Sequence, residues 1–166
     1  MVRRSTVTPC TIVDRPVRFT LDTNILVYAV DHDAGDRHHQ AIDLVRRSRS
    51  RDCVLTLQSL AELFRTLTSA KLRIEPARAA GLVQQWRDAL PVVAADDLCL
   101  TDAMDAVIHH GWSFWDAMIW ATAKRHGCRL LLSEDGQAGR TLGGVTILNP
   151  FAPGAQPLLD EALGGS

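Results

Sequence analysis

The stretch SFWDAMIWATAKRHGCRLLLSED, residues 113–135, combines a predicted helix, a predicted strand and two acidic side chains that bear on function. The helix is expected to end at Gly127, because glycine readily adopts the left-handed backbone that terminates helices. A short buried strand is expected over residues 129–132, which include three consecutive leucines. Asp116 lies in the first turn of the helix, and Asp135 lies three residues after the leucines. The stretch therefore predicts a helix that returns to a buried strand, with a carboxylate near the start of the helix and another past the end of the strand.

The same alternation of strand and helix continues through the rest of the chain. Four more short apolar strands, separated by longer amphipathic helices, are expected over residues 17–21, 53–57, 91–94 and 145–148. Short apolar strands that alternate with helices are typical of a parallel sheet with helices on both faces. The sequence therefore predicts an α/β fold, a three-layer α/β/α sandwich around a short-stranded parallel sheet.

Length and composition fit one domain with short extensions. The chain has 166 residues, of which 46% are hydrophobic and 22% are charged, so it can bury a sizeable core. Residues 1–17 show no clear periodicity and are expected to form an N-terminal extension. Residues 18–151 are expected to form the domain, and residues 152–166, which contain two prolines and a short apolar stretch, a C-terminal tail.

Charge and cysteine usage exclude several classes of protein. A net charge of −1, with 18 basic and 19 acidic residues, excludes a polycation that binds nucleic acid through bulk charge. The sequence contains neither a membrane-spanning apolar run nor the apolar core of a secretory signal, so a cytoplasmic protein is expected. The four cysteines are too far apart for a zinc site or a disulfide framework and are expected to be reduced: Cys10, Cys53, Cys99 and Cys128.

Four acidic residues follow predicted strands or begin helices: Asp22, Glu62, Asp116 and Asp135. Because the carboxyl ends of parallel strands meet at one edge of a sheet, we expect the four side chains to converge there. Two unit charges about 4 Å apart repel by about 1 kcal/mol in water and about 4 kcal/mol at an effective dielectric constant of about 20. Such a cluster therefore needs a cation, and its oxygen ligands favour Mg²⁺ or Mn²⁺.

Each acid also has a local structural interpretation. Glu62 and Asp116 each lie three residues after a serine, which is the spacing of a helix capping box. Asp22 could cap the turn that follows it, and Asp135 could belong to a surface turn over residues 134–136. The chain order favours convergence of the acids over four unrelated local roles.

Six segments at this spacing resemble the PIN-domain family, and in particular the VapC-like toxin ribonucleases of toxin–antitoxin pairs. The resemblance covers about residues 18–151, and its segments are LDTNILVYAVD (21–31), HHQA (38–41), QSLAELF (58–64), SFWDAMIWATAKRHGC (113–128), LLSEDGQ (131–137) and NPF (149–151).

The resemblance implies a metal-dependent endoribonuclease that hydrolyses RNA. It implies that Mg²⁺ or Mn²⁺ is held by the four catalytic acids, Asp22, Glu62, Asp116 and Asp135. It places supporting polar side chains around the cofactor site, namely Thr23, Asn24 and Ser133, with Asn24 orienting Asp22. A small antitoxin protein and a homodimer are the partners that it implies.

Two other classes of protein would need residues that this chain lacks. A haloacid-dehalogenase-type phosphatase needs a second aspartate where this chain has Asn24, and a dinucleotide-binding fold needs a glycine-rich turn after the first strand. Two alternatives stay open within the resemblance: a free-standing PIN nuclease in RNA processing, and a PIN-like RNA-binding module without catalysis. The second should lack one or more of the acids, and this chain has all four.

Some features have two interpretations. The basic run RRSRSR, residues 46–51, could bind an RNA backbone or simply end a solvated helix. Trp112, Trp115 and Trp120 could stack on bases, although the spacing of Trp115 and Trp120 favours the core or a dimer interface. An antitoxin groove is expected between the helical turn over residues 25–30 and the predicted helix that carries Leu60, Leu63, Phe64 and Leu67. The alternative is that these apolar residues belong to the core, which is favoured for Leu60 and Leu63.

Overall fold

The centre of the molecule is a mostly parallel sheet of short strands. The computed structural model describes residues 17–135 and 138–164, and within them the strand order is β3-β2-β1-β4-β6-β5. Neighbouring strands run parallel, except that β5 pairs with β6 in the antiparallel direction. The strands are β1 (Phe19–Leu21), β2 (Cys53–Thr56), β3 (Val92–Val93), β4 (Leu130–Leu132), β5 (Thr141–Leu142) and β6 (Val145–Leu148).

Each of the five predicted strands is present and lies inside its predicted range, whereas β5 was not predicted. β5 is joined to β6 by Gly143 and Gly144, whose φ angles are 54° and 80°. A two-residue hairpin turn requires positive φ at both central positions, and glycine adopts it without strain. The otherwise parallel sheet therefore ends in one antiparallel edge strand.

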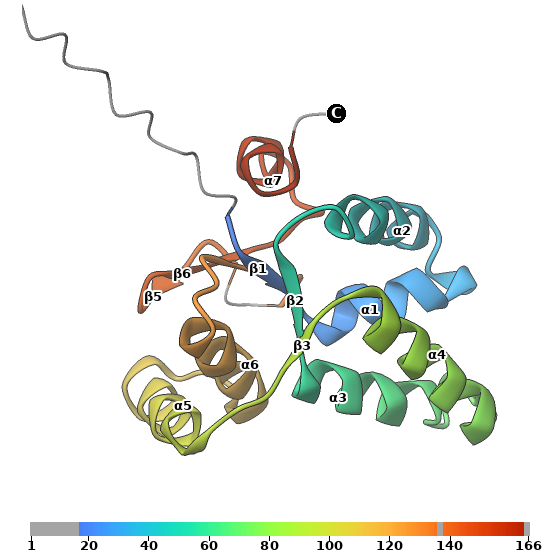
Figure 1. Ribbon diagram of the computed structural model, residues 1–166, viewed down its shortest axis with the longest axis horizontal. Helices are drawn as coiled ribbons and strands as arrows, with labels where there is room; N and C mark the ends of the chain where they lie inside the picture. Colours follow the sequence, from blue (N-terminus) through green and yellow to red (C-terminus); the bar gives the residue numbers. More distant parts are fainter. Residues whose placement is uncertain (1–16, 136–137, 165–166) are drawn as a thin grey trace, which may run out of the picture.

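Helices cover both faces of the sheet and complete three layers, as predicted (Figure 1). They are α1 (Thr23–Val30), α2 (Asp36–Ser48), α3 (Leu57–Leu67), α4 (Pro76–Ala89), α5 (Asp97–His110), α6 (Phe114–Arg125) and α7 (Gln156–Leu163), with a short 3-10 turn η1 (His32–Ala34). Buried side chains of α1 to α4 and α7 form one core, and those of α5 and α6 form a second. Leu130 and Leu132 belong to the first core and Leu131 to the second, so alternate residues of β4 face opposite layers.

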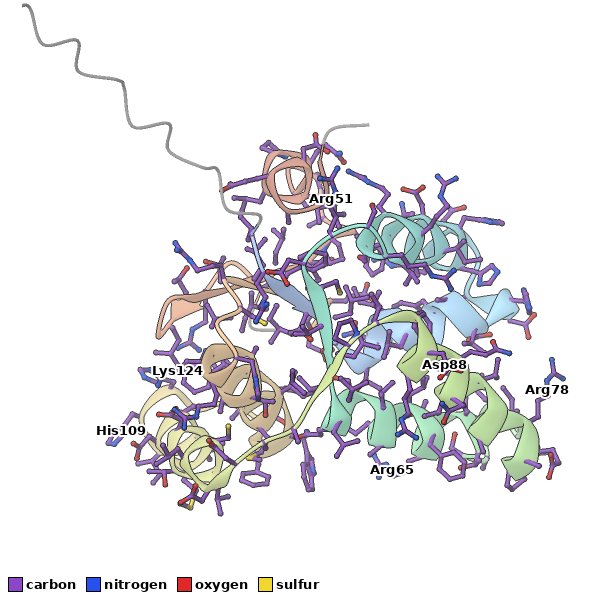
Figure 2. All side chains as sticks on the ribbon, in the orientation of Figure 1. Arg51, Arg65, Arg78, Asp88, His109 and Lys124 are labelled. Carbon is purple, nitrogen blue, oxygen red and sulfur yellow. The ribbon has the colours of Figure 1, made fainter. Side chains whose placement is uncertain are left out.

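The outer surfaces of the helices carry the charged side chains. Arg65 on α3, Arg78 on α4 and His109 on α5 are exposed and point away from the sheet (Figure 2). No helix of the described residues is long and apolar enough to cross a membrane. The basic run is partly structural, because Arg47 donates to Asp160 Oδ1 at 3.2 Å and to the Gly164 carbonyl at 2.7 Å, and so joins α2 to α7.

The segments on either side of the predicted domain differ in what the structure describes. α7 lies within the predicted tail, and its Leu159, Ala162 and Leu163 are buried in the first core. The domain boundaries at residues 17 and 151 stay predictions, and residues 1–16, which include Cys10, lie outside the described part of the chain. In the described part, Cys53, Cys99 and Cys128 are buried and form no disulfide.

Candidate active site at the carboxyl edge of the sheet

Asp22 lies where β1 ends and α1 begins, at the centre of the sheet. Its backbone N–H donates to the Leu132 carbonyl at 2.9 Å, which extends the pairing of β1 with β4 by one residue. Ser133 follows β4 directly, so Asp22 and Ser133 leave neighbouring strands at the same edge. The parallel register therefore places the ends of the two strands side by side.

The carboxylate of Asp22 is buried, with 6% of the residue exposed, and is held by donors on both oxygens. The Thr23 backbone N–H donates to Oδ1 at 2.6 Å, and the Ser133 hydroxyl donates to Oδ2 at 2.6 Å. Asn24 Nδ2 donates to the same Oδ2 at 3.2 Å. Asp22 thus serves as the helix cap that its position suggested and also has a fixed orientation at the strand end.

The amide of Asn24 connects three groups of the site. Besides Asp22, its Nδ2 lies 3.3 Å from Ser133 Oγ and 3.3 Å from Asp135 Oδ2. Its Oδ1 is buried without a hydrogen-bond partner among the described residues. Thr23 differs from the other two predicted supporting residues, because its hydroxyl donates to the Ser59 carbonyl at 3.4 Å and so faces α3. Of the three predicted supporting residues, Asn24 and Ser133 are therefore the ones whose side chains contact the acids.

Three of the four predicted acids share one pocket, and Glu62 is not among the residues that line it. Asp22, Asp116, Asp135 and Ser133 line one small pocket, whose apolar wall includes Trp112 and Ile119. Glu62 lies beside this pocket, and its charge acts on Asp116. The predicted meeting of acids at one sheet edge is thus what the fold produces.

Burial and mutual repulsion disfavour ionisation of two of these acids. Burial raises the pKa of Asp22 to about 7, against hydrogen bonds from Ser133 and Thr23 that lower it, and the charges of Asp135 and Asp116 raise it further. Burial also raises the pKa of Asp116, as do the charges of Asp135 and Glu62. The side-chain charges that raise the pKa of Asp22 and Asp116 are those of neighbouring acids, namely Asp135, Asp116 and Glu62. The site therefore carries an excess of negative charge that a bound cation would relieve.

The oxygen donors of this pocket suit a hard divalent cation, although they do not form a closed cage. Within the described residues, no group of three or more His, Cys, Asp or Glu side chains is close enough together to hold a metal ion by itself. Mg²⁺ needs no such cage, because it keeps several waters and is commonly bound through one or two carboxylates. Asp22, Asp116 and Asp135 offer carboxylates, and the unpartnered Oδ1 of Asn24 offers a further oxygen.

The local interpretation of Glu62 as part of a capping box is wrong. α3 begins at Leu57, two residues before Ser59, and Thr56 caps it by accepting the Ser59 N–H at 3.0 Å. Glu62 therefore lies in the second turn of the helix, too far from the cap to bond to it. Its partner is Gln58, whose Nε2 donates to Glu62 Oε1 at 2.7 Å, a contact that the i, i+4 spacing could have revealed.

The tryptophans near the site divide into two groups. Trp120 is 4% exposed and packs edge-to-face against Trp112, which is 3% exposed, with ring centroids 5.4 Å apart. Trp115, which precedes Asp116, is 59% exposed. Trp120 is thus a core residue, as its spacing favoured, whereas Trp115 is not, and its exposed ring leaves base stacking or an interface open.

The chain is similar to known proteins in sequence and in fold. A PIN-domain sequence profile matches residues 19–141. A search of curated proteins gives no significant match. Among solved structures, DNA-bound VapBC from Salmonella typhimurium is 18% identical with a TM-score of 0.60, covering 79% of this chain and 96% of that one.

Two further solved structures are similar. VapC20 of Mycobacterium tuberculosis, described as a toxin that cleaves the sarcin-ricin loop, is 20% identical with a TM-score of 0.58, covering 71% of this chain and 90% of that one. PAE2754 from Pyrobaculum aerophilum is 18% identical with a TM-score of 0.58, covering 90% of this chain and 97% of that one. At these identities the structures establish a shared fold, and the profile match covers most of the sequence. The chain belongs to the PIN-domain family.

Proposed function

We propose that this protein is a metal-dependent endoribonuclease that hydrolyses RNA phosphodiester bonds, and that it is the toxin of a toxin–antitoxin pair. The observation that carries the proposal is the gathering of Asp22, Asp116 and Asp135 in one pocket, with the charge of Glu62 acting on Asp116. Such a cluster destabilises the protein unless a cation binds to it.

Different residues of the cluster would bind the ion and orient the groups around it. Asp22, Asp116 and Asp135 would hold the ion, and Glu62 would orient the attacking water or hold a second ion. Ser133 and Asn24 fix the Oδ2 atom of Asp22, so this ligand needs little rearrangement to bind. When bound, Mg²⁺ or Mn²⁺ lowers the pKa of a coordinated water and neutralises charge that develops on the phosphate.

The direct test is RNA cleavage by Asp116→Asn, which keeps the shape of the side chain and removes its charge. We expect the fold to survive and cleavage in Mg²⁺ or Mn²⁺ to fall by orders of magnitude. Asp105→Asn is the matched control, because Asp105 is exposed on α5 and the change in charge is the same. Full cleavage by Asp116→Asn, or by wild type in excess chelator, contradicts the proposal and favours an RNA-binding module.

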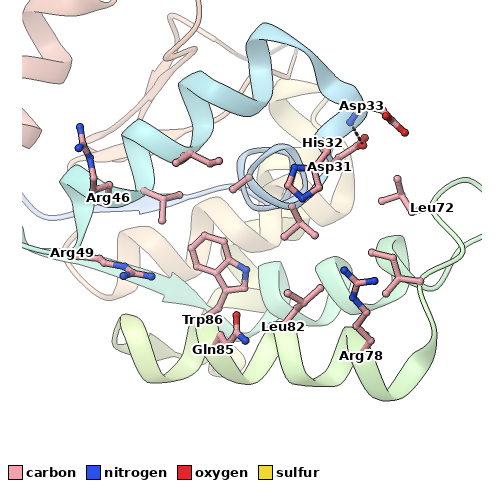
Figure 3. Close-up of a pocket in the computed structure, with 15 residues that line it drawn as sticks. Asp31, His32, Asp33, Arg46, Arg49, Leu72, Arg78, Leu82, Gln85 and Trp86 are labelled. Carbon is pink, nitrogen blue, oxygen red and sulfur yellow. Dashed lines mark hydrogen bonds between the residues drawn. The ribbon is translucent and has the colours of Figure 1, made fainter.

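The antitoxin part of the proposal needs a docking surface, and the leucines of the groove expected between α1 and α3 are not available for one. Leu60, Leu63 and Leu67 are at most 1% exposed and belong to the first core, as their alternative interpretation held. A cavity of about 660 Å³ lies instead between the end of α1, η1, α2 and α4 (Figure 3).

The side chains around this cavity fit an amphipathic protein segment. Its wall is apolar and includes Val30, Leu82 and Trp86, while arginines stand on the α2 and α4 sides and two aspartates on the η1 side: Arg46, Arg49, Arg78, Asp31 and Asp33 (Figure 3). A segment that places apolar side chains inside and carboxylates against the arginines would match this surface. The solved VapBC complex supports a protein partner for this fold.

The test of the partner is a pull-down with the product of the adjacent reading frame. Ile42 lines the cavity and is 44% exposed, so Ile42→Asp should abolish capture without unfolding the protein. Leu158→Asp, at a residue 40% exposed on α7 and away from this cavity, is the matched control. Recovery of no partner from the native host would favour the free-standing processing nuclease.

We also propose a homodimer, supported by an exposed apolar stripe on α5. Leu100, Met104 and Ile108 recur every four residues and are 44%, 45% and 71% exposed. A stripe of this kind on a folded surface commonly marks an interface. A monomeric mass in light scattering at tens of micromolar protein would contradict the dimer.

A further inference from the structure

Gln58 connects the two helices that carry Glu62 and Asp116. Its Nε2 donates to Glu62 Oε1 at 2.7 Å, within α3. The same nitrogen donates to the backbone carbonyl of Trp115 at 2.9 Å, across 57 residues of sequence, at the start of α6. We infer that Gln58 is a positioning residue, which fixes the carboxylate of Glu62 relative to the first turn of α6 and hence relative to Asp116.

The hydrogen bond from Gln58 to Trp115 is important because α3 and α6 belong to different layers of the fold. Buried residues of α3 pack in the first core and those of α6 in the second, with the sheet between them. The relative placement of Glu62 and Asp116 therefore depends on contacts that pass over the edge of the sheet. Gln58 provides a hydrogen bond that does so directly.

The chemistry of the contact requires a side chain that can donate two hydrogen bonds. The Glu62 carboxylate and the Trp115 carbonyl are both acceptors, so the NH₂ group of Gln58 must face them, with one hydrogen for each. A glutamate at this position would repel Glu62, and a leucine would fill the same space without donating. Glutamine thus meets a requirement that neither of these residues of similar size meets.

Repulsion between the acids explains why such a tie is needed. The negative charge on Glu62 disfavours ionisation of Asp116, so the two side chains tend to separate. An ordinary i, i+4 pair on a helix surface would stabilise α3 alone. The second bond of Gln58 turns this local pair into a link between the two helices.

The inference rests on the proposed function for its activity measurement, and Gln58→Leu is the variant that tests it. Outer residues that orient metal ligands typically change metal affinity or activity by roughly 10- to 100-fold. For Gln58→Leu we therefore expect Mn²⁺ affinity, measured by calorimetry, and kcat on a labelled random-sequence 20-nucleotide RNA to fall by about 10-fold or more, while KM changes less than about two-fold.

Gln84→Leu is the matched control. Gln84 donates to Asp88 Oδ1 at 2.7 Å, also at i, i+4, but on the exposed side of α4 and outside the acidic cluster. It removes the same kind of bond, so Mn²⁺ affinity and kcat should match wild type. If Gln58→Leu behaves like Gln84→Leu in both measurements, the inference is wrong.

A double-mutant cycle separates positioning from a general loss of stability. If Gln58 acts through Glu62, Gln58→Leu should change kcat by less than about two-fold in a Glu62→Ala background. Loss by the same factor in both backgrounds would mean that Gln58 only supports the fold. Wild-type protein that neither binds Mn²⁺ nor cleaves RNA would refute the proposed function and the inference with it. Normal wild-type binding and cleavage with an unaffected Gln58→Leu refutes the inference alone.

Discussion

Replacing Asp22 by asparagine should stabilise the metal-free protein at alkaline pH. Asp22 is 6% exposed, and burial raises its pKa from 3.8 to about 7. A folded-state pKa above the unfolded value means that the folded state binds the proton more tightly, so ionised Asp22 opposes folding at high pH. The opposition is complete above pH 7 and disappears as the pH falls toward 3.8.

The size of the effect follows from the two pKa values. The rise from 3.8 to about 7 is about three units, and each unit corresponds to about 1.36 kcal/mol, so ionised Asp22 costs at most about 4 kcal/mol. The substituted asparagine would keep an oxygen for the Thr23 N–H, but its amide would face the Ser133 hydroxyl, whose oxygen already accepts from the Asp135 N–H at 3.1 Å and from Asn24 Nδ2 at 3.3 Å. The new amide would also face the Nδ2 of Asn24, which offsets part of the gain. We expect a net gain of about 1–3 kcal/mol at pH 8.

Urea unfolding in EDTA at pH 5, 6, 7 and 8 measures this gain. The stability difference between Asp22→Asn and wild type should grow with pH and level off above pH 7. Asp105→Asn, which changes an exposed acid, should show no such trend. A variant that is less stable than wild type at pH 8, or a difference independent of pH, refutes the reasoning. Added Mg²⁺ should stabilise wild type and leave the variant almost unchanged.

The remaining predictions concern the scaffold. Leu63→Ala should lower the free energy of unfolding by about 2–5 kcal/mol in urea, because Leu63 is fully buried, whereas Phe64→Ala, at a residue 38% exposed, should cost much less. Arg47→Ala should increase hydrogen exchange and proteolysis in α7 before global unfolding, since Arg47 holds Asp160 and the carbonyl of Gly164. Unchanged protection of α7 would show that its apolar face alone docks it.

The strands and most helices could be predicted because their local signals agree with their tertiary positions. The leucines of β4 form a continuous apolar run, which a strand buried on both faces requires. β5 was missed because Thr141 and Leu142 form no apolar run, and because its pairing depends on the turn that follows. The capping box placed the cap of α3 at Ser59, three residues after the observed cap Thr56, since both residues are good caps and only the structure distinguishes them.

The part of the candidate site that follows from the order of the strands could be predicted from the sequence. Chain order places Asp22 and Asp135 after neighbouring parallel strands, so their approach follows from the fold class. Gln58 was missed because its second partner is 57 residues away, in a helix of another layer. The misplaced groove has a similar cause. The periodicity of Leu60, Leu63 and Leu67 marks a buried face, but cannot show whether another protein or the chain itself covers it.

The central claim is that the gathered carboxylates bind a divalent cation, and anomalous scattering from crystals soaked in Mn²⁺ tests it most directly. The account predicts a peak between Asp22 and Asp116, at about 2.0–2.3 Å from carboxylate oxygens, which Mg²⁺ displaces and which Asp116→Asn crystals lack. No peak at this edge of the sheet in saturating Mn²⁺, or a peak that persists unchanged in Asp116→Asn, would contradict it.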